Sequence, residues 1–147
     1  MKFALLLMLS LGSLSSLASD CKFKAGPDIW DFAIKMMEKR GCVLDENSPL
    51  ELVFEKEVIS MNTASHFGAV CPFIEVSTFH YSLVDTNTGS VIARGSEVNA
   101  SDVKYSFDYE NGEAIPKDLI YCGYESFLHP TIRKAIKRLM KDFNNGK

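Results

Sequence analysis

Three histidines are the residues of this chain best suited to acid–base chemistry. His66 lies in a polar stretch five residues before Cys71, and His129 directly precedes Pro130. A histidine beside a carboxylate is a common general base in hydrolases, so His66 and His129 are the candidate catalytic residues. His80 lies inside an apolar, β-branched segment. If its face of that segment is the core, we expect a buried histidine with satisfied hydrogen bonds.

Four cysteines form the second chemical constellation: Cys21, Cys42, Cys71 and Cys122. An even count in an exported chain predicts two disulfides, and four cysteines allow three pairings, among which the sequence does not choose. Cys21–Cys42 together with Cys71–Cys122 would give the shorter loops. A free Cys71 thiolate activated by His66 would be a nucleophile, but in an oxidising compartment we expect Cys71 to be oxidised.

The chain shows no motif for a metal or a cofactor. It has no CxxC, HExxH or GxSxG sequence, no glycine-rich phosphate loop, and no histidine three or four residues from a cysteine. Glu51, Glu55 and Glu57 could bind a cation, but such a row is typical of the wet face of a strand. Asn99–Ser101 is a glycosylation sequon that matters only in a eukaryotic secretory pathway.

The first 18 residues have the three parts of a secretory signal peptide. Lys2 is the positive part, Phe3–Leu11 is the apolar part, and Ser16-Leu17-Ala18 supplies small residues for cleavage. The apolar part is too short to span a bilayer, which takes about 20 residues. We therefore predict a signal peptide over 1–18, a single domain over 19–147, and an exported chain, periplasmic or secreted, without a transmembrane segment.

Charge is distributed unevenly along the chain, which has 16 basic and 19 acidic residues. Between Thr131 and Lys147 six residues are basic and only Asp142 is acidic. An acidic body with a basic end favours intramolecular attraction, and it is unlike a nucleic-acid-binding domain, which is basic overall. Arg133, Lys137 and Lys141 are candidate binding residues, and they would meet lipid head groups if this segment were a membrane-surface helix. We expect its apolar stripe to pack on a sheet instead.

Hydrophobic periodicity predicts two helices around a sheet. Pro27–Arg40 begins with a proline and ends before Gly41, and a second helix begins at Pro130. Alternation and β-branched content predict strands between them: Leu50–Ile59, Phe73–Val84, Val91–Val98 and Val103–Tyr109. We therefore predict an α+β fold, a two-layer sandwich in which an antiparallel sheet of about three to five strands is flanked by an N-terminal and a C-terminal helix.

Tyrosines on and after the last predicted strand are the candidates for an aromatic binding surface. They are Tyr105, Tyr109, Tyr121 and Tyr124. Exposed aromatic side chains are common at protein interfaces, although the same residues serve equally well in strands and cores.

The order of these segments resembles small bacterial cell-envelope proteins. A helix ends at a glycine within Ile34–Val43, a strand follows at Leu50–Ile59, and Tyr81–Ala93 holds an Asp-x-x-Thr-Gly hairpin ahead of the terminal helix. This arrangement is similar to the curli-secretion-channel-like group and to the lipoprotein activators of penicillin-binding proteins. The resemblance implies an accessory or assembly role in the envelope, with no catalytic residues. Lipid attachment is not expected here because Asp20 precedes Cys21.

We therefore predict an exported, non-catalytic protein that binds another cell-envelope or extracellular component through a sheet face or a strand edge. One alternative is a small secreted hydrolase that pairs His66 or His129 with a carboxylate. Another is a secreted inhibitor or effector whose recognition loop is stiffened by disulfides. The expected partner is a protein or an envelope component, not a nucleic acid, and the sequence predicts no oligomeric state.

Overall fold

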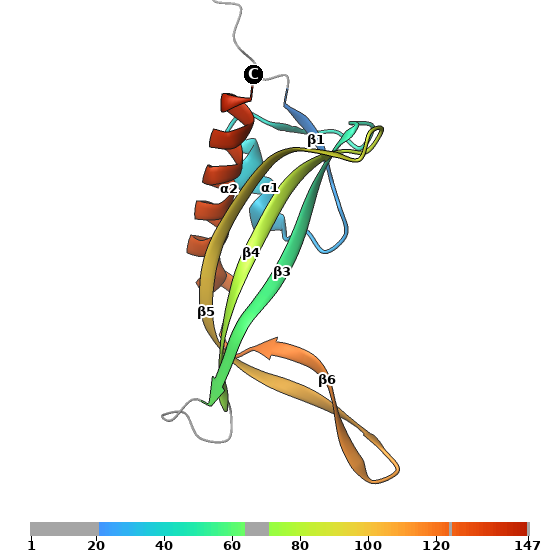
Figure 1. The fold of residues 1–147 in the computed structure, drawn as a ribbon, viewed down its shortest axis with the longest axis vertical. Helices are drawn as coiled ribbons and strands as arrows, with labels where there is room; N and C mark the ends of the chain where they lie inside the picture. Colours follow the sequence, from blue (N-terminus) through green and yellow to red (C-terminus); the bar gives the residue numbers. More distant parts are fainter. Residues whose placement is uncertain (1–20, 64–70, 124, 147) are drawn as a thin grey trace, which may run out of the picture.

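The computed structural model describes residues 21–63, 71–123 and 125–146. Six strands form one mixed sheet in the order β2-β1-β3-β4-β5-β6. The strands are β1 (Lys22–Ala25), β2 (Val43–Leu44), β3 (Leu50–Thr63), β4 (Phe73–Asp85), β5 (Ser90–Glu110) and β6 (Glu113–Tyr121). The helices are α1 (Asp31–Glu38), the 3-10 helix η1 (Glu125–Leu128) and α2 (His129–Asn145). Both α-helices cover the same face of the sheet (Figure 1).

The predicted antiparallel sheet of three to five strands flanked by two helices is wrong. The sheet has six strands and is mixed, because β1 pairs in parallel with both β2 and β3. A strand, not a helix, therefore begins the described chain. The disulfide between Cys21 and Cys42 joins the residues that immediately precede β1 and β2, and β1 also pairs with β3, so this four-residue strand has a partner strand on each side.

The strands predicted at Val91–Val98 and Val103–Tyr109 are one continuous strand, β5, of 21 residues. The polar stretch between them stays extended because it pairs with β4, where Asn99 lies opposite Ser77 and Asp102 lies opposite Ile74. Strand β3 likewise continues to Thr63. The sheet is therefore much longer than the helices that cover it.

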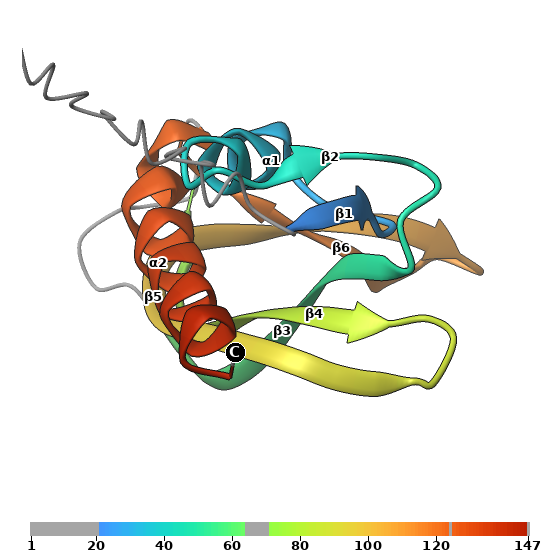
Figure 2. The ribbon, with the colours of Figure 1, turned by 90° about the horizontal axis from the view of Figure 1, so that it is seen from above.

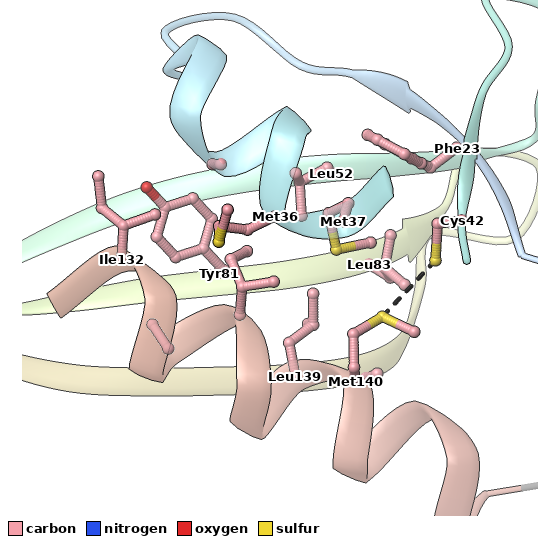
Figure 3. Packing of buried hydrophobic residues seen from close by; sticks show 14 of the residues in the cluster. Phe23, Met36, Met37, Cys42, Leu52, Tyr81, Leu83, Ile132, Leu139 and Met140 are labelled. Carbon is pink, nitrogen blue, oxygen red and sulfur yellow. Dashed lines mark hydrogen bonds between the residues drawn. The ribbon is translucent and has the colours of Figure 1, made fainter. Parts of the chain in front are cut away.

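The core lies between the helices and one face of β3, β4 and β5. Along β4 every second side chain points into it, and Phe79, Tyr81 and Leu83 are almost completely buried. Figure 3 shows Tyr81 and Leu83 beside Met36 and Met37 of α1 and Met140 of α2. Sγ of Cys42 lies 3.6 Å from Sδ of Met140, and because Cys42 is in a disulfide this is a sulfur–sulfur packing contact. On β3, Leu52 lies in this core and the partly buried Phe54 packs against it.

Helix α1 begins later than the sequence predicts. Asp28 has a positive φ of 61°, so the segment after Pro27 turns and the first helical residue is Asp31. The turn places Trp30 against Phe54 and Phe79, with ring centroids 6.2 and 6.0 Å away. Gly41, with φ 86°, follows the helix as the sequence predicts.

Helix α2 covers the outer edge of β5 as well as its face. Oδ2 of Asp142 accepts a hydrogen bond from the backbone N–H of Arg94 at 2.9 Å. The guanidinium of Arg138 donates to the backbone carbonyl of Ser96 at 2.5 Å. These contacts satisfy backbone groups that an uncovered edge strand would offer to another chain.

The end of β5 and the whole of β6 form a hairpin that leaves the helix-covered body, and we call residues 105–121 the arm. Figures 1 and 2 show the arm on the side of the molecule away from α2. Its base is fixed by the disulfide between Cys71, just before β4, and Cys122, just after β6. Both disulfides of the sequence prediction are confirmed, with the pairing that gives the shorter loops.

Candidate functional site

The face of β3, β4 and β5 opposite the helices, which we call the open face, carries a polar constellation around His80. The register places His80 opposite Glu55 of β3 and Ser96 of β5. Nδ1 of His80 lies 2.7 Å from Oγ of Ser96, and Nε2 lies 3.3 Å from Oε2 of Glu57. His80 is therefore on the solvent side of the sheet, because the alternate residues of β4 form the core.

This constellation borders a shallow hollow of about 320 Å³. The hollow is lined by Val53, Glu55, His80, Ser82, Val84, Val91, Arg94 and Ser96. A serine bonded to an imidazole whose second nitrogen faces a carboxylate is the arrangement that activates a serine in many hydrolases. Here the side chain of Glu57 is 72% exposed, so water screens its interaction with His80.

The two histidines predicted from the sequence as catalytic are not part of this constellation. His129 stacks on Phe32, with ring centroids 3.7 Å apart and planes within 4°. It borders a hollow of about 400 Å³ together with Asp31 and Glu125. Within the described residues no carboxylate is hydrogen-bonded to His129. His66 lies outside the described residues.

The four candidate tyrosines have different surroundings. Tyr109 is 76% exposed on the arm, whereas Tyr105 is half-buried and donates from its hydroxyl to Sδ of Met61 at 2.8 Å. The hydroxyl of Tyr121 lies 3.4 Å from Oε1 of Glu75 at the base of the arm. Tyr124 lies outside the described residues. The structure therefore leaves Tyr109 as the most exposed of the three that it describes.

Tyr121 belongs to a polar network on the helix side of the sheet. Nζ of Lys56 donates to both carboxylate oxygens of Glu75, at 3.1 and 3.2 Å, and lies 3.3 Å from the Tyr121 hydroxyl. Burial alone would lower the pKa of Lys56, but its hydrogen bonds to Glu75 and Tyr121 outweigh burial and raise that pKa. Burial also raises the pKa of Tyr121. At neutral pH these raised pKa values keep Lys56 an ammonium and Tyr121 a neutral phenol.

The arm has exposed apolar side chains on both of its faces. Phe107 is 47% exposed and lies on the face of Tyr109, while Ile115 and Ile120 are exposed on the other. Lys117 and Asp108 form an exposed ion pair across the arm at 2.9 Å. Among the described side chains of the arm, Tyr121 alone packs against the buried core, and it is only partly buried.

The basic side chains of α2 divide into two groups. Arg138 and Lys134 pair with Glu97 of β5, with N to O separations of 2.5 and 3.9 Å. The others are the sequence candidates Arg133, Lys137 and Lys141, which face solvent. Arg133 also lies over the ring of Phe32, 5.8 Å from its centroid. The apolar stripe of α2 is buried on the sheet, as the sequence predicts.

Sequence reasoning missed the Ser96–His80–Glu57 constellation and Phe107. The available signal was partial: Glu57 continues the charged row of Glu51 and Glu55 on β3, whereas β4 around His80 has apolar residues on both of its faces. Their meeting depends on the register between β3, β4 and β5, which spacing along the chain does not give.

Within residues 21–63, 71–123 and 125–146, no three His, Cys, Asp or Glu side chains are grouped so that they could hold a metal ion. No helix in those ranges is long and apolar enough to cross a membrane. The chain matches no protein-family model and no curated protein sequence.

Proposed function

We propose that this chain is an exported, non-catalytic protein that uses its arm to bind another component of the cell envelope or the extracellular medium. The observation that carries the proposal is the exposure of Phe107 and Tyr109 on a hairpin that leaves the core. Aromatic side chains are enriched at binding sites because they bury a large area at a small entropic cost.

The way the arm is held supports this use. Its C-terminal end is joined to the sheet by the Cys71–Cys122 disulfide, and the N–H of Cys122 donates to the carbonyl of Asp102 at 2.9 Å. A binding element with a fixed base loses less conformational entropy when its partner docks. The disulfides also support export, because they persist in oxidising compartments.

The free edges of the sheet favour docking through the arm over strand addition. Only the first residues of β3 pair with β1, and beyond them Lys56 and the bulge next to Val58 interrupt a regular edge. Strand β6 contains Pro116, which has no N–H to offer to an added strand. Charges, bulges and prolines are features that discourage edge-to-edge pairing.

A site-specific cross-linking experiment tests the proposal. A photoreactive residue is placed at Tyr109 of the mature chain, and a control protein carries it at Glu46, an exposed position between β2 and β3. Both are exposed to the envelope and medium of the source cells. We expect one discrete adduct from position 109 only, and we expect Phe107→Ser to remove it. Equal labelling from both positions, or an adduct that Phe107→Ser leaves unchanged, would contradict the proposal.

Ester or amide hydrolysis is a second candidate function, favoured by the hydrogen bond between Ser96 and His80. Its test compares Ser96→Ala and His80→Gln with the control Ser82→Ala, which lines the same hollow without contacting His80 through a hydrogen bond. A hydrolase would lose activity by about 100-fold or more in the first two variants and keep it in the control. Absence of hydrolysis by the unmodified chain would rule out this second function for the substrates used.

A further inference from the structure

We propose that the arm of one copy docks on the solvent face of α2 of a second copy, so that chains associate head to tail. The proposal rests on the proposed function in taking the arm as the binding element, and it adds a second copy of the chain as a partner of that arm. The surfaces involved are the tip of the arm, with Glu110 and Glu113, and the basic face of α2, with Arg133, Lys137 and Lys141.

The tip of the arm carries two like charges in direct opposition. Glu110 and Glu113 are a cross-strand pair on either side of the Asn111-Gly112 turn, and both are exposed. Opposite residues on paired strands lie about 5 Å apart at Cβ, and like charges at that separation repel each other. Within the described residues neither carboxylate has an ion-pair partner. A cation bound between them would relieve this repulsion.

The basic face of α2 presents cations at a matching spacing. Arg133, Lys137 and Lys141 are four residues apart, so successive side chains are separated by about 6 Å along the helix axis. All three are exposed, and no described acidic residue forms an ion pair with them. Two other basic residues of α2, Lys134 and Arg138, already form ion pairs with Glu97 of β5.

Aromatic contacts would add to the charge complementarity. Tyr109 adjoins Glu110 at the tip and is 76% exposed. An exposed ring can receive the stem of a lysine or the plane of an arginine. Arg133 already makes this kind of contact with Phe32 in its own chain.

The two surfaces of one chain cannot meet. Figures 1 and 2 agree that the arm extends on the side of the sheet away from α2. Contact between them therefore requires a second molecule. Because the arm and α2 are different surfaces, each docked copy keeps one of them free, and association continues until a ring closes or an open chain grows.

Sedimentation velocity of the purified mature chain is the first measurement. At about 0.01 M salt, where the Debye length is about 30 Å, we expect species larger than the monomer that increase with protein concentration. At about 1 M salt, where the Debye length is about 3 Å, we expect the monomer to predominate. A monomer at every concentration and at both salts would overturn the proposal.

A charge swap tests which surfaces meet. The first variant, Glu110→Lys with Glu113→Lys, has a basic tip and a basic helix. The second, Arg133→Glu with Lys137→Glu, has an acidic tip and an acidic helix. Each alone should weaken self-association by about tenfold or more, since two ion pairs are replaced by repulsions. Mixed in equal amounts, they offer each other complementary surfaces at both contacts and should associate again.

The matched control is Glu38→Lys with Glu46→Lys, which changes the net charge as the first variant does but at exposed sites outside both surfaces. It should associate like the unmodified chain. Failure of the mixture to associate, or equal weakening by the control, would overturn the proposal. If the purified chain stays monomeric while Tyr109 cross-links to a different component, the head-to-tail contact is wrong and the proposed function stands. If neither occurs, both are wrong.

Discussion

Nζ of Lys56 lies 3.1 Å from Oε1 of Glu75, a residue that is only 1% exposed, at the base of the arm. Replacing Lys56 by methionine would leave this carboxylate buried without its cation. Loss of one partner of a fully buried pair costs about 3–5 kcal/mol. Because Lys56 is 25% exposed, we expect a smaller loss of unfolding free energy, about 2 kcal/mol.

Chemical denaturation of Lys56→Met and of Lys56→Met with Glu75→Leu checks this prediction. The double variant removes both charges, so it should recover most of the stability that the single variant loses. A single variant as stable as the unmodified chain would show that the pair is not important for stability.

The same network predicts a loss of stability at alkaline pH. The pKa values of Lys56 and Tyr121 are raised above 10.5 and 10.0, so the folded state holds these protons more tightly than the unfolded state. Their stabilising contribution is complete below about pH 10. It is lost as the pH rises through the folded-state pKa values. The denaturation midpoint, measured at several pH values between about pH 8 and pH 11, should decrease as the pH approaches 11. Midpoints that stay constant or rise would contradict the prediction.

The two disulfides should contribute unequally to stability. They join residues 21 and 51 positions apart in the sequence. Loop entropy predicts about 3 kcal/mol for Cys21–Cys42 and about 4 kcal/mol for Cys71–Cys122. Replacing each pair by alanines and measuring unfolding without reductant checks the order. A larger loss from the Cys21–Cys42 replacement would show that packing of those buried sulfurs outweighs loop entropy.

Gly95 should not tolerate a side chain. A Cβ at this position would overlap the backbone of α2 at Ala135 and Leu139, which cannot move independently of the helix. We expect Gly95→Ala to lower the unfolding free energy by about 3 kcal/mol, from overpacking. The control Gly146→Ala meets no atom closer than 3.7 Å and should change stability by less than about 0.5 kcal/mol. Thermal or denaturant unfolding of both variants gives the comparison, and similar stabilities would contradict it.

The sequence predicts the local features of this fold well. The apolar stripe of α2 and the strand assignments of β3 and β4 follow from periodicity and β-branched content alone. The cysteine count predicts two disulfides, which the structure contains. In each case a few neighbouring residues carry the signal.

Features that depend on distant partners were not predictable. The polar residues from Asn99 to Asp102 resemble a break between strands, yet pairing with β4 keeps them extended. Lys22–Ala25 is too short to predict as a strand without knowing that Cys21 is joined to Cys42. His80 lies on an alternating strand with apolar residues on both faces, and only the position of the helices shows which face is the core.

Hydrogen–deuterium exchange of residues 19–147, with and without the component captured at Tyr109, tests most directly whether the arm is the binding element. We predict that added component slows amide exchange in peptides spanning residues 105–121, with little change on the open face around His80. Slower exchange around His80 and Ser96, with the arm unchanged, would contradict the account.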